Sequence, residues 1–209
     1  MLRKGLMILA ISALLGATMP ASVASAGPSG DAGATSYGQF TNYGRVDGTG
    51  IHLKPTSASP WLTLITPANP VTDFCYKTGE TLNGTAYWDV VYHPQQKLAG
   101  WTNEWYLTSK AQTLWCDDSA AMESYYGHNF AQYDNIAGLH SCTNNTCQVL
   151  TMLGAQVEAF ELCYSTGATL GTGNDRWSLL YYRVPGTSTV HVGWTHQNWL
   201  RLPGTTWHC

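Results

Sequence analysis

Six cysteines, seven histidines and thirteen carboxylates are the side chains of this 209-residue chain that could act as nucleophiles, metal ligands or acids and bases. No histidine stands in the H-x-x-x-H or H-E-x-x-H spacing of a metal site. His191 and His196 are five residues apart on an expected strand, where side-chain alternation directs them to opposite faces. Asp117 and Asp118 predict a solvated turn rather than an acid–base pair. We therefore expect no catalytic residue, no metal site, no cofactor and no enzyme activity.

The six cysteines are expected to form disulfides rather than to act as nucleophiles. They are even in number, which is typical of a disulfide framework in an exported protein. If all of them form disulfides, no thiol is left to act as a nucleophile. The cysteine count alone does not choose among the pairings of Cys75, Cys116, Cys142, Cys147, Cys163 and Cys209.

Charge and composition exclude one class of partner. Charged residues make up 11% of the chain and the net charge is −3 at pH 7, whereas an average soluble protein has roughly 25% charged residues. Without a run of lysine or arginine the chain has nothing to neutralise phosphates, so no nucleic-acid partner is expected. Glycine, threonine, tyrosine and tryptophan are abundant instead, which favours strands and turns.

The N-terminus predicts export. A positive start and a short apolar run at residues 6–15 precede the sequence A-S-A at 24–26, so we expect a signal peptide at 1–26. The run is too short for a transmembrane helix and no later stretch is longer, so no membrane span is expected. Residues 27–36 are small and polar and are expected to be disordered. The protein is therefore expected to be secreted, either extracellular or associated with the cell wall.

Longer segments of the chain are repeated. F-C-Y-K-T-G-E-T-L at 74–82 recurs as L-C-Y-S-T-G-A-T-L at 162–170, 88 residues later. The same offset matches His52 to His140, whose shared role the sequence leaves open. After one inserted residue, Trp88 matches Trp177. After a second, longer insertion, Gly100-Trp101-Thr102 matches Gly193-Trp194-Thr195 and Cys116 matches Cys209.

The longer insertion predicts a hairpin tip, because added residues cost little there. It lies between expected strands at 177–183 and 190–194 and contains V-P-G-T. About five short strands in about 70 residues are too few for a sandwich and fit a small barrel. Neither copy shows a sustained helical period.

Several motifs occur in the same order in both copies. They are G-L-H-S at 138–141, W-S-L-L at 177–180, G-W-T at 193–195 and W-L at 199–200, with W-D-V-V at 88–91, G-W-T at 100–102 and Y-L at 106–107 in the first copy. In this order each copy resembles the bacterial SH3-like (SH3b) domain, and the cysteine placement is similar to that of secreted actinobacterial members. The resemblance implies an all-β fold of two small, partly open SH3-like β-barrels in tandem, stapled by disulfides. His52 and His140 stand where the family usually has asparagine or arginine.

The duplication favours one set of disulfides. Duplicated modules tend to keep their bonds within each unit, which selects Cys75 with Cys116 and Cys163 with Cys209. Cys142 and Cys147 occur only in the second copy and are expected to close a tight loop. The alternative for them is a redox pair, although the C-x-x-C spacing is absent.

Aromatic rings are the remaining candidates for binding, with nine tryptophans and twelve tyrosines in the chain. Trp88, Trp101, Trp177 and Trp194 are expected to build the cores. An exposed ring offers a platform for a sugar ring or a peptide backbone. Alternatively, such rings pack one copy against the other. The positions expected to be exposed and to bind are Trp61, Tyr87, Trp105, Tyr106, Tyr182 and Trp199.

These expectations give a domain plan and a function. The first repeat is expected at 37–116, a linker at 117–134 and the second repeat at 135–209. Because SH3b domains commonly recognise peptidoglycan, the resemblance implies a secreted, non-catalytic protein that binds cell-wall peptidoglycan or a peptide. The alternative is a secreted protein–protein interaction factor such as a protease inhibitor, since wall-binding modules usually accompany a hydrolase. The sequence does not define the oligomeric state.

Overall fold

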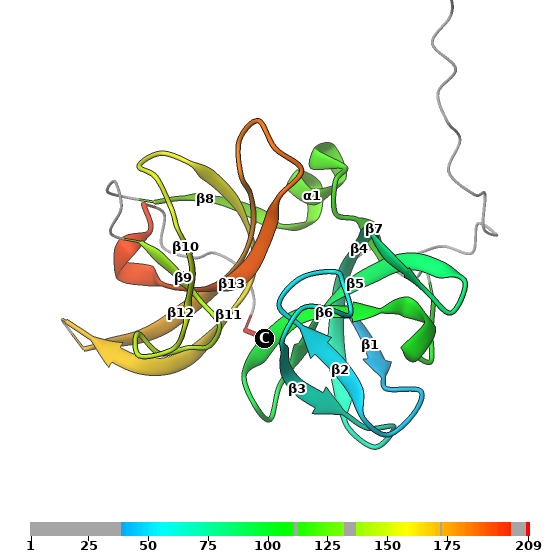
Figure 1. Cartoon of the computed structure of the whole chain (residues 1–209). Coiled ribbons are helices and arrows are strands. Elements are labelled where there is room, and N and C mark those ends of the chain that lie inside the picture. The colour runs from blue at the N-terminus through cyan, green and yellow to red at the C-terminus, as the bar shows by residue number, and fades with distance from the viewer. Residues whose placement is uncertain (1–38, 111–112, 132–136, 172, 202–207) are drawn as a thin grey trace, which may run out of the picture. The chain divides into compact units, whose positions relative to one another are not determined.

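The structure is a computed structural model that describes residues 39–110, 113–131, 137–171, 173–201 and 208–209 (Figure 1). The expected signal peptide and the polar segment at 27–36 lie outside these residues. The described part is mostly β and contains a single α-helix and two short 3-10 helices. None of its helices has the length and apolar character needed to cross a membrane.

The first half of the protein, residues 39–116, forms one sheet. Its strands pair in the order β1-β4-β5-β6-β2-β3, and each neighbouring pair is antiparallel. Strand β7 joins β4 in parallel. The elements are β1 (Phe40–Tyr43), β2 (Thr49–His52), β3 (Trp61–Ile65), β4 (Pro70–Leu82), β5 (Thr85–His93), β6 (Leu98–Asn103), η1 (Glu104–Tyr106) and β7 (Leu114–Trp115).

The second half, residues 127–209, forms a second sheet with the order β10-β9-β13-β12-β11-β8. Read from β8, this is the strand order of the first sheet, with each strand in the place of its counterpart. The sequence duplication is therefore also a duplication of strand order. The elements are β8 (Gly127–Phe130), β9 (Gly138–His140), β10 (Val149–Met152), β11 (Glu158–Leu170), β12 (Asn174–Arg183), β13 (Val190–His196) and η2 (Gln197–Trp199).

The longest strands explain why the sheets curl, as the bent β11 and β12 show in Figure 1. The pairing register shifts between Asp73 and Cys75 on β4 and between Glu161 and Cys163 on β11. Such irregularities bend a strand and increase its twist, which rolls a sheet toward a half-barrel. The predicted hairpin of the second copy is confirmed, because Arg183 of β12 pairs with Val190 of β13.

Four tryptophans form the centres of packing, as predicted. Trp88, Trp101, Trp177 and Trp194 are at most 1% exposed. The indole N–H of Trp88 donates to the carbonyl of Glu80 at 2.8 Å, and that of Trp177 donates to Ala168 at 2.9 Å. Because each bond joins the two strands of a long hairpin, β4–β5 or β11–β12, the rings also fix how the hairpins bend.

The three disulfides join Cys75 to Cys116, Cys142 to Cys147 and Cys163 to Cys209. The first and last are the pairs that the duplication favours, and the second closes the expected tight loop. The backbone N–H of Cys116 donates to Tyr76 at 2.9 Å and that of Cys209 to Tyr164 at 2.8 Å, so both tails lie beside the long strand of their own half. Three disulfides are compatible with an extracellular location.

The disulfides should differ in their resistance to reduction, because exchange requires access of a thiolate to a sulfur. Cys75 and Cys116 are both 0% exposed, whereas Cys142 and Cys147 are half-buried. In native protein treated with a mild reductant and an alkylating agent, mass spectrometry should find label on Cys142 and Cys147 well before Cys75 and Cys116. Equal rates of labelling would contradict the difference in burial.

The two sheets share one core. Along β12, Trp177, Leu179 and Tyr181 belong to a cluster that also contains Trp88 and Trp101 of the first half. The alternate residues Leu180 and Tyr182 face a separate core within the second half. Both faces of β12 are therefore covered.

The contacts between the halves are reciprocal. Tyr92 lies edge-on to Trp194 with ring centroids 5.6 Å apart, and Trp101 lies edge-on to Tyr181 at 6.3 Å. In the repeat, Tyr92 corresponds to Tyr181 and Trp101 to Trp194. Each half therefore offers the same two rings to the other, as in an interface between identical subunits.

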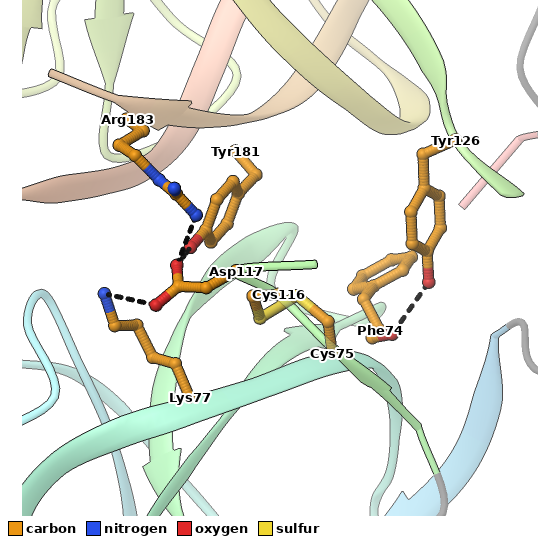
Figure 2. The surroundings of a disulfide bond; sticks show 8 residues. All are labelled: Phe74, Cys75, Lys77, Cys116, Asp117, Tyr126, Tyr181 and Arg183. Carbon is orange, nitrogen blue, oxygen red and sulfur yellow. Dashed lines mark hydrogen bonds and ion pairs between the residues drawn. A yellow bond between two sulfur atoms is a disulfide. The ribbon is translucent and has the colours of Figure 1, made fainter. Parts of the chain in front are cut away.

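The segment expected to link the repeats is largely structured. Helix α1 (Ser119–Tyr125) is capped by the Asp118 carboxylate, which accepts from the N–H of Ala121 at 3.1 Å. Strand β8 also falls in the expected linker, yet it pairs with β11 and so forms an edge of the second sheet. In Figure 2, Tyr126 at the end of α1 donates its hydroxyl to the carbonyl of Phe74.

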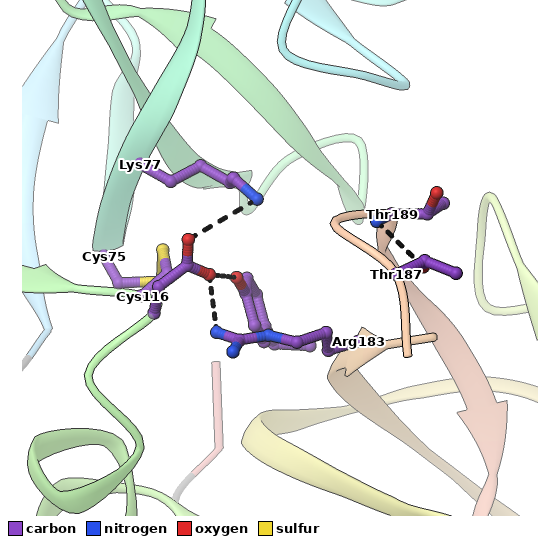
Figure 3. A network of polar contacts seen from close by, with 8 residues as sticks. Cys75, Lys77, Cys116, Arg183, Thr187 and Thr189 are labelled. Atoms are coloured by element: carbon purple, nitrogen blue, oxygen red, sulfur yellow. Dashed lines mark hydrogen bonds and ion pairs between the residues drawn. A yellow bond between two sulfur atoms is a disulfide. The ribbon is translucent and has the colours of Figure 1, made fainter. Parts of the chain in front are cut away.

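Asp117 lies in a turn, as the sequence predicts, and Asp118 is exposed, but the carboxylate of Asp117 is bonded to other side chains rather than only solvated. Its carboxylate accepts from the Tyr181 hydroxyl at 2.9 Å and from Arg183 at 2.6 Å, and it lies 3.7 Å from the Lys77 ammonium (Figure 2). Figure 3 shows the side chains of Lys77 and Arg183 converging from the two halves. Burial, followed by the charge of Asp117, raises the pKa of Tyr181, which keeps the hydroxyl protonated as a donor. Asp117 thus ties β12 of the second half to β4 of the first.

Candidate binding groove

A groove of about 180 Å³ opens on the first half where strands β2, β3 and β5 meet the 3-10 helix η1. Its floor contains the fully buried Trp88, and Trp61 at the start of β3 is 63% exposed. The groove therefore combines an apolar base, an open indole and several hydrogen-bonding side chains. The polar and aromatic residues that line it are Thr49, His52, Ser57, Trp61, Trp88, Asn103 and Tyr106.

His52 is held in one orientation by its surroundings. Its Nδ1 lies 3.0 Å from the carbonyl oxygen of Ser59, and its ring stands perpendicular to those of Trp61 and Trp88, with centroids 6.0 and 5.5 Å away. Because a carbonyl only accepts, Nδ1 carries the proton and Nε2 is left as an acceptor. Burial lowers the pKa of His52, which favours this neutral form at pH 7.

The matched histidines share a structural role. His140 has its Nδ1 3.3 Å from the carbonyl of Cys147 and its ring perpendicular to Trp177. A Cβ at Gly50 or Gly138 would come within 2.8 Å of Nε2 of the following histidine, so only glycine leaves room for the ring. In both halves the imidazole thus closes the loop that follows β2 or β9.

The far wall of the groove comes from the 3-10 helix. Asn103 caps η1 by accepting from the N–H of Trp105 at 3.1 Å. The Tyr106 hydroxyl accepts from Asn83 at 3.1 Å. Trp105 packs edge-on to Tyr106 and carries the Arg45 guanidinium over its ring at 4.6 Å. These contacts fix both rings without covering the groove.

The corresponding surface of the second half has different side chains. Val149 stands in the place of Trp61, and His196 in the place of Asn103. The His196 ring is fully buried, packs against Trp177 at 5.2 Å and lies 2.9 Å from the carbonyl of Asn174. The second half therefore lacks the exposed indole. At the position of Asn103 it carries the larger imidazole side chain of His196.

The structure brings together part of the predicted aromatic set. Trp61 and Tyr106 line the groove, and Trp105 contacts Tyr106. Tyr87 is half-buried in a separate cluster with Tyr76 and Trp115.

The two candidates in the second half lie away from the groove. Trp199 is half-buried against the core of its own sheet. Tyr182 is only 5% exposed and stacks on His191, so its expected exposure is wrong. It is buried because β12 is covered on both faces.

A larger cavity, of about 640 Å³, lies beside α1 and the second sheet. Glu123, Glu158, Phe160, Tyr181 and Arg183 are among its lining residues. The Tyr181 hydroxyl and the Arg183 guanidinium both bond to Asp117, so its best-placed polar groups already connect the two halves. None of the six predicted binding aromatics lines it.

Sequence reasoning missed a buried acidic cluster in the first half. Asp73, Asp89 and Glu104 are at most 5% exposed. Asn42 donates to Asp73 at 3.0 Å, but neither carboxylate oxygen of Asp89 has a hydrogen-bond partner among the described residues. Burial raises the pKa of Asp73 to about 7, and burial followed by the charges of Asp73 and Glu104 raises the pKa of Asp89.

The second half replaces this cluster with Glu161, Ser178 and Gln197. Ser178 donates to Glu161 at 2.6 Å and accepts from Gln197 at 3.2 Å. The repeat could have revealed the acidic cluster, because the three acids of the first half match one acid and two neutral residues of the second half.

Within the described residues, no three side chains of His, Cys, Asp or Glu are grouped so that they could hold a metal ion. Comparison with known proteins found no protein-family model, no curated protein and no solved structure that matches this chain.

Proposed function

We propose that this chain is a secreted, non-catalytic binding protein whose two sheets are SH3-like domains in tandem, and that its first half binds a peptide of cell-wall peptidoglycan. The observation that carries the proposal is the open Trp61 ring above a groove that contains His52, Asn103 and Tyr106. Exposed rings beside fixed polar groups suit a peptide or a sugar, because the ring desolvates the ligand while the polar groups orient it.

The duplicated strand order supports the SH3-like part of this proposal, since each copy places a 3-10 helix directly after the G-W-T strand. The disulfides support secretion, because such bonds persist in oxidising surroundings. The binding role is favoured over catalysis by the groove itself, in which the histidine is tied through Nδ1 to a backbone carbonyl rather than to a nucleophile.

Retention on purified peptidoglycan tests the proposal. The wild-type protein should sediment with insoluble peptidoglycan, and Trp61→Ala should weaken retention about tenfold, the loss expected when one aromatic platform is removed. Val149→Ala, at the matched position of the second half, is the control and should bind like the wild type. Circular dichroism should show that both variants stay folded.

Two results would oppose the proposal. Equal retention of the wild type and Trp61→Ala would show that the groove does not bind the wall. Retention only by a protein from the culture medium, and not by peptidoglycan, would favour the alternative of a secreted interaction factor such as a protease inhibitor.

A further inference from the structure

We propose that the group recognised in the groove is a primary ammonium of a peptide, placed between the Trp61 ring and the Glu80 carboxylate. This inference rests on the proposed function and adds the chemical class of the ligand. It is carried by three features of the first half: the fixed carboxylate of Glu80, the open indole of Trp61 and the uncharged acceptor of His52. The second half keeps only the histidine.

The carboxylate of Glu80 is fixed at the edge of the groove. Its Oε2 accepts three hydrogen bonds, from the Thr56 hydroxyl at 2.8 Å, the Ser57 N–H at 2.6 Å and the Ser57 hydroxyl at 2.8 Å. Ser57 itself lines the groove. These bonds hold the pKa of Glu80 below its ordinary value, so the group is ionised at neutral pH. All three use Oε2, and no described residue bonds to Oε1.

The indole of Trp61 provides the second contact. The ring is anchored edge-on against His52, and 63% of the residue is exposed. The face of an indole attracts a cation through the ring quadrupole. Ser57, which holds the Glu80 carboxylate, lines the same groove as Trp61, so the carboxylate and the open indole together favour a positively charged ligand group over an apolar one of the same length.

His52 adds an acceptor without adding positive charge. Its neutral ring presents Nε2 toward Gly50 in the wall of the groove. The guanidinium of Arg45 is engaged elsewhere, over the ring and near the carbonyl oxygen of Trp105. A flexible ammonium has three donors, which matches the acceptors available from Glu80 and His52.

The second half provides a natural comparison. The counterpart of Trp61 is Val149 and the counterpart of Glu80 is Ala168, while His140 keeps the place of His52. The second half has thus kept the histidine that shapes the loop and lacks both groups that would attract a cation. Trp61→Val and Glu80→Ala are accordingly replacements that the same strand framework already accommodates.

Two model peptides test the charge preference in solution. The probes are N-acetyl-glycyl-lysyl-glycinamide and the same peptide with norleucine in place of lysine, titrated into the folded, oxidised protein and followed by NMR shifts. The lysine peptide should bind about tenfold more tightly, since a cation–π contact and an exposed ion pair add together. Glu80→Ala should remove most of the preference, Trp61→Val should weaken both peptides, and Glu123→Ala, a control acid on α1, should change neither.

A second arm uses peptidoglycan whose free amines have been acetylated with acetic anhydride. Retention of the wild type should fall to the level of Glu80→Ala on untreated wall. If acetylation leaves retention unchanged while Trp61→Ala still loses it, the groove binds the wall and the ammonium proposal is overturned. If Trp61→Ala is retained on both forms, the proposed function fails as well.

Discussion

Asp89→Ser should raise the free energy of unfolding by about 3 kcal/mol at pH 8 and leave it nearly unchanged at pH 4. Asp89 is 1% exposed, and its carboxylate has no hydrogen-bond partner among the described residues, so its charged form is strongly disfavoured in the folded protein. Serine occupies the matched position 178, where its hydroxyl donates to Glu161. Urea unfolding of the oxidised protein at a series of pH values measures the effect.

The direction of the pH dependence follows from which state holds the proton. Burial raises the pKa of Asp73 from 3.8 to about 7 and also raises that of Asp89, so the folded protein binds protons that the unfolded chain releases. Stability from this source is complete below about pH 4 and is lost as the pH rises toward 7 and beyond. The difference at Asp73 alone corresponds to about 4 kcal/mol.

The reverse exchange is the control. Ser178→Asp should destabilise the second half at pH 8 and have a much smaller effect at pH 4, because it recreates the crowded acids beside Glu161. A wild-type stability that is flat from pH 4 to pH 8, and that Asp89→Ser does not alter, would contradict the assignment.

Trp194→Ala should lower the free energy of unfolding by about 4 kcal/mol while unfolding remains a single transition. Trp194 is fully buried and contacts Tyr92 of the first half, and the main core contains residues of both halves. Trp101→Ala removes the reciprocal contact and should behave alike. The matched control is Trp61→Ala, whose exposed ring should contribute no more than about 0.5 kcal/mol.

Hydrogen exchange measured by mass spectrometry reads the two halves separately. In Trp194→Ala, peptides from β5 and from β12 should lose protection together, because both strands contribute to the core cluster that the two halves share. Loss of protection confined to residues 127–209 would show that the halves fold independently.

The strand duplication and two of the three disulfides could be predicted from the sequence because both depend on repetition. A strand order that is used twice leaves the same pattern twice, and Cys75 with Cys116 recurs as Cys163 with Cys209. Buried tryptophans were predictable for the same reason.

The environments of Tyr182 and Asp117 could not be predicted from the sequence, and both depend on the packing of the two halves against each other. Alternation along a strand predicts one buried and one exposed face, but β12 packs against its own core on one side and the first half on the other. Tyr182 is buried for that reason, and Asp117 is drawn into the contact between halves. The groove was only partly foreseen, because the contribution of His52 depends on a loop contact with Ser59 that spacing does not reveal.

The reciprocal ring pairs between the halves predict how a shortened chain would behave. A fragment ending after the first disulfide would leave Tyr92 and Trp101 uncovered on one flank. Two such fragments, turned to face one another about a twofold axis, would restore both ring pairs, since each carries one member of each. The two ring pairs are thus arranged like those of a homodimer whose subunits have been joined into a single polypeptide.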